Sequence, residues 1–279
     1  MALSIHSLKK NDTQSFTEKK RFSGLTGWID KTFVYRDETE YLERSDVSLA
    51  EKFRIVETLT NLNARSGYNA LFLYHLEALI QSLSGSLSRN RPINILDTGV
   101  GGGGMLETIY NWAMKKEIPV ALHGIDISND FVERAQTRLL QRNIPAKIWS
   151  STACKVKMPN DSFDIVISSY MVHHIRGMGK VALFLSEVYR LAKYGWLIAD
   201  FDRRLLSPLF AKTAGFLFGA RGPLLSDGVK SARRAYSSYE INQIIQGIKS
   251  VQDIGAMKCR KFPIAPYWYI RGSKFSSND

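Results

Sequence analysis

The segment from residue 91 to 104 constrains the fold of this chain more than any other part of the sequence. A short apolar run ends at Asp97, and five glycines then fall within six residues, Gly99 and Gly101–Gly104. Residues 105–116 follow with the apolar spacing that is typical of a helix. A strand, a glycine turn and a helix in this order bring bare backbone N–H groups against a ligand. We therefore expect a nucleotide-like ligand at this turn.

A second acidic residue favours a nucleotide site over a flexible glycine linker. Asp126 ends another apolar run 23 residues past Gly103, a spacing that suits a carboxylate binding ribose hydroxyls. In the alternating set Asp97-x-Gly99-x-Gly101-x-Gly103 the first member is an acid. A carboxylate there would repel a pyrophosphate but can bind a cationic amino-acid end. The set therefore differs from a dinucleotide fingerprint, and the Lys-Ser/Thr ending of a phosphate-binding loop does not follow it.

Composition bounds the class of protein. The 279 residues are 44% hydrophobic, enough for a sizeable core, and no 18-residue window is uninterruptedly apolar. The N-terminus lacks an apolar secretory segment, and Cys154 and Cys259 are too few for a disulfide framework or a metal site. We therefore expect a cytoplasmic protein.

The net charge of +12 is concentrated near the C-terminal end. Residues 203–279 hold 13 Lys and Arg against four Asp and Glu. Such an excess could attract nucleic acid, anionic lipid or an acidic substrate, or could be a solvated basic surface. The sequence shows no known RNA-binding module, so a nucleic-acid partner is not expected, whereas peripheral membrane contact stays open.

The order of the apolar patterns predicts an α/β domain behind a helical segment. We expect a flexible N-terminus over 1–24, an N-terminal helical cap over 25–90, and one domain over 91–279. In this domain strands alternate with helices, which is typical of a parallel sheet with its ligand outside the carboxyl ends of the strands. The expected cap helices are 46–64 and 69–84, the strands 93–97, 120–125, 146–149, 164–169 and 195–201, and the later helices 104–116, 129–142 and 179–192.

Three segments of the domain resemble one known family. The set Asp97-x-Gly99-x-Gly101-x-Gly103 is similar to the D/E-x-G-x-G-x-G motif of class I S-adenosylmethionine-dependent methyltransferases. Residues 162–175 and 187–200 resemble later segments of small-molecule methyltransferases in quinone and polyketide pathways. The resemblance implies a Rossmann-like fold with a mostly parallel seven-stranded sheet and helices on both faces. It implies two further strands, at 250–259 and 265–272, of which the last is antiparallel.

The resemblance also implies S-adenosyl-L-methionine as cofactor and assigns residues to it. One position departs from the family, because Thr152 stands where an acid usually meets the adenine amino group. That departure leaves a catalytically inactive, cofactor-binding scaffold open as an alternative. The implied cofactor-binding residues are Asp97, Gly99, Gly101 and Gly103 for the amino-acid end, Asp126 for the ribose, Ile127 and Thr152 for the adenine, and Ser168 for the methionine portion.

Candidate catalytic residues follow the fourth expected strand. Methyl transfer from an activated sulfonium needs an oriented acceptor and, for a hydroxyl or acidic carbon, a base. His173 and His174 are such bases, although either imidazole could instead be structural. Tyr170 could line the acceptor pocket. For Asp200 and Asp202 we expect a solvated strand end.

The acceptor must be inferred from residues outside these motifs. An insertion at about 203–237 contains an apolar stretch, 205–220, which could be a lid, a membrane-resting segment with Arg203, Arg204, Lys212 and Arg221 toward headgroups, or a core helix. Ser237 and Glu240 form a capping box that opens a helix. Lys230, Arg233 and Arg234 could neutralise an acidic acceptor.

Taken together, the sequence predicts an S-adenosylmethionine-dependent methyltransferase of an apolar or aromatic small molecule, acting on oxygen or carbon. The competing function is RNA methylation, which only the net charge favours. The sequence shows neither the Asn/Asp-Pro-Pro-Tyr/Phe pattern of base-amino methylation nor a cysteine near the fourth strand.

Overall fold

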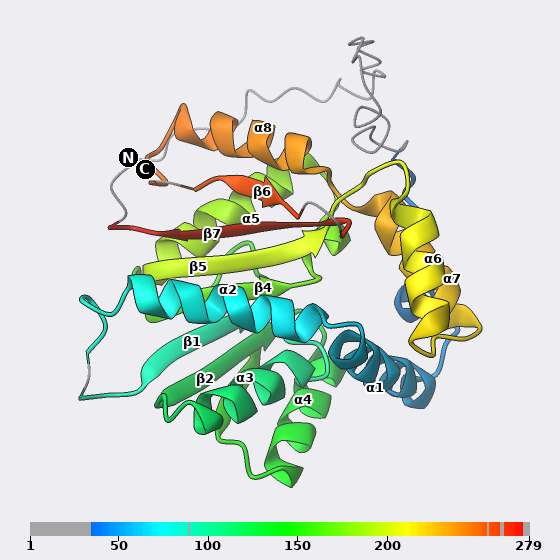
Figure 1. Cartoon of the computed structure of the whole chain (residues 1–279), viewed down its shortest axis with the longest axis horizontal. Coiled ribbons are helices and arrows are strands. Elements are labelled where there is room, and N and C mark those ends of the chain that lie inside the picture. Colours follow the sequence, from blue (N-terminus) through cyan, green and yellow to red (C-terminus); the bar gives the residue numbers. More distant parts are fainter. Residues whose placement is uncertain (1–34, 89, 256, 263–264, 276–279) are drawn as a thin grey trace.

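A computed structural model describes residues 35–88, 90–255, 257–262 and 265–275 (Figure 1). The expected flexible segment 1–24 and residues 25–34 of the expected cap lie outside the described residues. The part of the chain that is described forms a central sheet with helices packed on it. Within this part, every helix is too short or too polar to cross a membrane.

Within the described residues the sheet has seven strands, the number predicted, and their order is β3-β2-β1-β4-β5-β7-β6. Strands β1 to β5 are parallel to one another, and β7 is antiparallel to both β5 and β6. The strand order reverses between β1 and β4, and ligands of open α/β sheets bind outside the carboxyl ends at such a reversal. The strands are β1 Ile93–Thr98, β2 Val120–Asp126, β3 Ala146–Ser150, β4 Phe163–Ser169, β5 Ala192–Phe201, β6 Cys259–Lys261 and β7 Tyr267–Ser273.

Successive residues of the central strands point to opposite faces, and each face is covered by its own helices (Figure 1). Ile95 and Leu197 belong to a core shared with α2, α3 and α4, while Leu96 and Trp196 belong to one shared with α5 and α8. All four side chains are fully buried, which contributes about 1.5–3 kcal/mol for each aliphatic one. These helices are α2 Tyr68–Ser82, α3 Gly104–Lys115, α4 Asn129–Gln141, α5 Met178–Leu191 and α8 Ser238–Lys249.

The two helices before the sheet have different surroundings. In α1, Leu49–Arg65, the Ser48 hydroxyl caps the first turn by accepting from the Glu51 N–H. This helix lies against the glycine turn after β1, because a Cβ added at Gly102 would be 2.6 Å from Val56 Cγ1. By contrast, α2 buries Leu76 in the same core as the sheet. The N-terminal segment therefore borders the expected cofactor site and also covers one sheet face.

Two helices, α6 Ser207–Leu217 and α7 Pro223–Arg234, form the insertion after β5. They lie side by side beyond the end of β5 (Figure 1). In α6 the buried residues are Ser207 and Gly215, and Leu209 and Leu217 are exposed. A core helix over 205–220 was therefore the wrong alternative, because its apolar side chains are turned outward.

The expected strand over 250–259 is also wrong. Only its last residue is in β6, and the residues before it form a loop in which Gly255 has a φ of 60°. The Gly255 N–H donates to Asp253 Oδ1, a turn that interrupts extended backbone. Ile254 and Met257 are nevertheless buried. The apolar residues of segment 250–259 thus indicated a buried segment and not a strand. The capping box that opens α8 is confirmed.

Candidate cofactor and active site

The glycine turn has the backbone conformation that its sequence predicts. Gly99, Gly101 and Gly103 have φ values of 93°, 49° and 80°, a region that disfavours residues with a Cβ. A Cβ at Gly99 would lie 2.4 Å from Met171 Cγ, whereas a Cβ at Gly101 would meet open space. Gly101 is therefore the point of the turn where a ligand can approach the backbone.

Asp97 supplies a buried carboxylate at the end of β1. Its side chain is 2% exposed, and its Oδ1 has no hydrogen-bond partner among the described residues. Burial, followed by the charge of Asp126, raises the pKa of Asp97 to about 7. An unpaired buried carboxylate is costly, and a cationic donor removes that cost. The ammonium of an amino acid fits this atom.

Asp126 and its neighbours form the second part of the expected cofactor site. Asp126 Oδ2 accepts from the Gly101 N–H and its Oδ1 accepts from the Ser128 N–H, both at 3.0 Å. A carboxylate has further lone pairs, so these bonds leave acceptor capacity for ribose hydroxyls. Ile127 is largely exposed and offers an apolar surface beside them. Thr152 is exposed as well, and its hydroxyl accepts from the Cys154 N–H.

Ser168 lies inside β4 and is fully buried. Its hydroxyl donates to the Thr98 carbonyl at 3.1 Å, and the Thr98 hydroxyl donates to the Ile167 carbonyl at 3.0 Å. These two bonds join β1 to β4 at the reversal of strand order. A role of Ser168 toward the methionine portion stays a prediction, and its hydroxyl already has a partner.

His173 and Asp200 form a buried pair beyond the ends of β4 and β5. His173 Nδ1 lies 2.7 Å from Asp200 Oδ1, and the His173 N–H donates to Asp200 Oδ2 at 3.0 Å. His173 Nε2 faces Glu40 Oε1 at 3.8 Å. Burial alone would lower the pKa of His173, but the charge and hydrogen bond of Asp200 and the charge of Glu40 outweigh it and raise that pKa. The solvated strand end expected for Asp200 is thus wrong.

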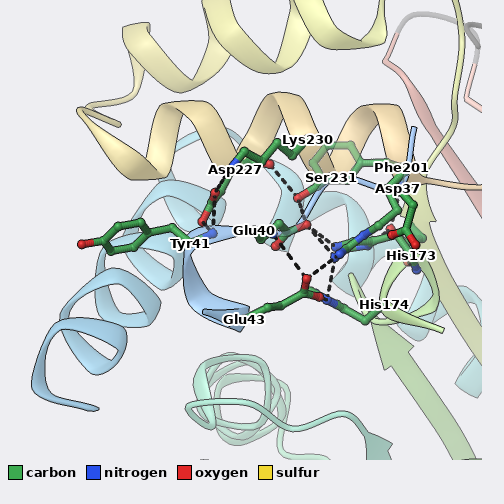
Figure 2. Close-up of polar contacts among 12 residues, drawn as sticks. Asp37, Glu40, Tyr41, Glu43, His173, His174, Phe201, Asp227, Lys230 and Ser231 are labelled. Atoms are coloured by element: carbon green, nitrogen blue, oxygen red, sulfur yellow. Dashed lines mark hydrogen bonds and ion pairs between the residues drawn. The ribbon is translucent and has the colours of Figure 1, made fainter. Parts of the chain in front are cut away.

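Residues 35–44, called the strap below, precede α1 and lie against His173 and His174 on one side and against α7 on the other (Figure 2). Glu40 of the strap is buried and accepts from the Ser231 hydroxyl at 2.7 Å and from Arg234 at 2.8 Å. The next acid, Glu43, pairs with Arg234 and with His174, at 2.7 and 2.9 Å. Burial would raise the pKa of Glu43, but these hydrogen bonds hold it well below its usual value. The strap residues 35–44 are therefore held by charges from two distant parts of the chain.

Glu40, His173 and His174 have ligand atoms within 4.8 Å of one another, as a metal site would. The Arg234 guanidinium, however, lies 2.8 Å from Glu40 Oε1 and 2.9 Å from His174 Nδ1. A cation already balances this carboxylate, so the group is an ion-pair network around an arginine. Arg234 is almost fully buried, which also removes it from the role expected toward an acidic acceptor.

An aromatic cluster of four rings lies beside the His173–Asp200 pair: Tyr68, Tyr170, Phe201 and Tyr267. Tyr170 stacks on Tyr68 with ring centroids 4.0 Å apart and lies 4.8 Å from Phe201. Tyr170 has a φ of 53°, a strained conformation for a residue with a Cβ, which directs its ring into the cluster. The Phe201 ring contacts His173 edge to face at 5.9 Å. The cluster therefore joins β4, β5 and β7 to the start of α2.

Tyr68 connects the two halves of the site. Its hydroxyl shares a 3.0 Å hydrogen bond with Ser169. Burial raises its pKa well above the ordinary value, and the carboxylates of Asp200 and Asp97 both add to that increase. The charges of the expected cofactor carboxylate and of the His173–Asp200 pair thus both act on one phenol. This convergence matches the crevice that the strand order predicts.

The comparisons with known proteins agree with this geometry. Residues 95–195 match the family described as "Methyltransferase domain". The fold is that of a class I methyltransferase, and the cofactor of that class is S-adenosyl-L-methionine. The chain therefore contains a methyltransferase domain over residues 95–195. A search of curated proteins found no match.

Three solved structures are similar to this methyltransferase. The plantazolicin methyltransferase BpumL, in complex with a monoazolic desmethyl analogue and S-adenosylhomocysteine, is 15% identical, with 79% of this chain and 90% of that one covered and a TM-score of 0.54. The magnesium protoporphyrin IX methyltransferase from Synechocystis PCC 6803 is 14% identical, with 82% and 89% covered and a TM-score of 0.47. A SAM-dependent methyltransferase from Aquifex aeolicus is 16% identical, with 66% and 83% covered and a TM-score of 0.45.

Other expected residues of the methyltransferase lie away from solvent. Asp202 is buried and bonds to the Arg204 guanidinium at 2.9 Å, which contradicts a solvated strand end. Arg203 is buried beside Glu240 and donates to the Ala235 carbonyl. Arg203 and Arg204 are therefore structural and do not face lipid headgroups. Glu40, Tyr68 and Tyr267 could not be predicted from the sequence, because they lie far from every motif and no local pattern distinguishes them.

Proposed function

We propose that this methyltransferase acts on oxygen or carbon of an apolar or aromatic small molecule. The aromatic cluster beside the His173–Asp200 pair carries the proposal, because flat rings bind flat apolar acceptors and exclude water. Tyr68, Tyr170 and Tyr267 offer such rings, and each pKa is raised by burial. Their phenols are therefore poor bases at neutral pH.

The cofactor residues that the family resemblance assigns fit this chain. S-adenosylmethionine would supply a methyl group already activated on a sulfonium. Asp97 would accept from the ammonium of its amino-acid end, Asp126 would accept from the ribose hydroxyls, and Ile127 would pack on the adenine. Gly99, Gly101 and Gly103 would let the backbone approach, and Thr152 and Ser168 would border the ligand.

His173 would remove the acceptor proton. In one tautomer its Nδ1–H donates to Asp200, which leaves the lone pair of Nε2 to accept the proton. Asp200 would then hold the ring in place, as an acid beside a catalytic histidine does in other enzymes. The charges of Asp200 and Glu40 would stabilise the imidazolium that forms. His174 points its Nδ1 to Glu43 and Arg234, so it is the less suited of the two histidines.

We also propose that the segments outside residues 95–195, the part that matches the methyltransferase family, shape the acceptor site. Residues 25–90 would act as a cap on the cofactor side, as α1 over the glycine turn indicates. Residues 203–237 would act as a lid, because Phe210 of α6 contacts Tyr267 of the aromatic cluster at 6.2 Å. Tyr170 would then lie against the bound acceptor.

Calorimetric titration with S-adenosylhomocysteine, followed by an acceptor screen, tests the function. The protein should bind the cofactor product at micromolar concentration, and labelled methyl transfer should go to phenols and quinols over polar amines. Exclusive transfer to RNA oligonucleotides would contradict the proposed acceptor, and binding without transfer to any acceptor class would favour the inactive scaffold.

A further inference from the structure

The α6–α7 hairpin carries an apolar stripe that no other described residue covers. Leu206, Leu209, Phe216 and Leu217 are each more than half exposed. Their separations of three, seven and one residues place them on one face of α6, within roughly a 100° arc. Apolar patches of this kind on a protein surface are typical of interaction sites.

The charged residues in the sequence segment that carries this apolar stripe have one sign. Residues 203–226 contain four Lys and Arg and no Asp or Glu. Arg203 and Arg204 are buried, which leaves Lys212 and Arg221 on the surface. Lys212 lies four residues before Phe216, about 40° from it around the helix, and the Arg221 guanidinium lies over the Phe216 ring at 4.5 Å. The stripe is therefore bordered by cations.

A groove runs along the hairpin beside the stripe. Its volume is about 510 Å³, and it is lined by apolar side chains from both helices, by three cations and by one acid, Glu38 of the strap. The apolar and cationic residues include Leu209, Lys212, Leu225, Val229 and Lys230. Leu209 of the stripe and Lys212 of its cationic border also line the groove. The groove thus gives room for part of a lipid chain next to a cationic border.

We propose that α6 docks on an anionic membrane surface, with the apolar stripe below the headgroups and Lys212 and Arg221 among the phosphates. Apolar area combined with attraction to anionic lipid is what holds interfacial helices. A second copy of the chain fits less well, because a symmetric contact would bring the same cations of both copies together. The inference does not depend on methyl transfer.

Sedimentation with lipid vesicles tests the docking. One set of vesicles is phosphatidylcholine alone, and the other is equal parts phosphatidylcholine and phosphatidylglycerol. The wild-type chain should bind the anionic vesicles at least about tenfold more strongly than the neutral ones, and added salt should weaken that binding. Equal binding to both, or to neither, overturns the proposal.

Matched variants separate the stripe from non-specific adhesion. Leu217 is 76% exposed and Leu140 of α4 is 77% exposed, so Leu217→Asp and Leu140→Asp add the same charge to equally exposed sites. Leu217→Asp should reduce the vesicle partition coefficient by about tenfold, and Leu140→Asp should leave it within about twofold. The pair Lys212→Glu and Lys115→Glu tests the cationic border in the same way. Equal effects within either pair contradict docking by α6, and circular dichroism confirms that each variant is folded.

Discussion

The proposed cofactor side and the proposed acceptor side of the site are built in different ways. The cofactor side comes from two short segments, the glycine turn after β1 and the end of β2, which are joined by the bond from the Gly101 N–H to Asp126. The acceptor side comes from α2, β4, β5, β7, α7 and the strap, whose contacts span up to about two hundred residues of sequence. A local motif thus encodes one side, and long-range packing encodes the other.

The two sides also differ in how they handle charge. Asp97 on the cofactor side is a buried acid with an unpaired oxygen, which is a place for an external cation. Glu40 on the acceptor side is equally buried, but Arg234 and Ser231 satisfy it within the chain. Asp97 is therefore the carboxylate that we propose binds the ligand, whereas Glu40 stabilises the structure. Substitutions on the two sides should separate binding from turnover and stability.

The largest expected effect is on turnover, from His173→Ala. Removal of the base should reduce turnover by about 100-fold or more, while binding of S-adenosylhomocysteine stays within about twofold. His174→Ala is the matched control and should cost less than about fivefold, because His174 is half-exposed. An equal loss of cofactor binding and turnover in His173→Ala would make that histidine structural and would remove the contrast between the two sides.

Next in size is the loss of stability in Arg234→Ala. This change leaves Glu40 buried without its cation and should reduce the free energy of unfolding by about 3–5 kcal/mol, as for other broken buried pairs. The neighbouring Arg233→Ala, at a half-buried side chain 3.3 Å from Glu38, should cost about 1 kcal/mol or less. Urea unfolding followed by circular dichroism measures both. Similar losses in the two variants would show that the strap is not held by the buried pair.

A smaller effect is expected for cofactor affinity in Asp126→Ala. Loss of the carboxylate removes the acceptor for the ribose and the partner of the Gly101 N–H, and should weaken S-adenosylhomocysteine binding by about 10- to 100-fold. Glu133→Ala, an exposed acid on the neighbouring α4, should leave affinity unchanged. Calorimetry that finds the same affinity in both variants would refute the cofactor site assigned here.

The difference between the two sides of the site, one local and one built by long-range packing, explains which parts could be predicted from the sequence. The strands and the mostly parallel sheet could be predicted from hydrophobic periodicity and the family resemblance. The cofactor residues stay predictions, which rest on a motif whose members lie within one turn, as at Asp97 and Gly101. The partners of His173 could not be predicted, because Asp200 resembles any acid at a strand end. Tyr68 resembles any aromatic residue of an apolar helix. Their proximity depends on the register of β4 against β5 and on the packing of α2, which no local pattern encodes.

The smallest expected effect is a pH dependence on the cofactor side alone. The pKa of Asp97 is about 7 in the folded chain, above its ordinary value of 3.8, so between these pH values the unfolded chain binds fewer protons. Stability of the unliganded protein should therefore fall as pH rises from about 4 to about 7. A bound ammonium favours the charged carboxylate, so affinity for S-adenosylhomocysteine should rise over the same range and become constant above it, by about tenfold between pH 6 and pH 8. Thermal shifts with and without the ligand measure this, and Asp97→Asn should bind weakly with no such dependence. A wild-type affinity that is flat across this range would mean that the unpaired oxygen of Asp97 is not where the cation binds.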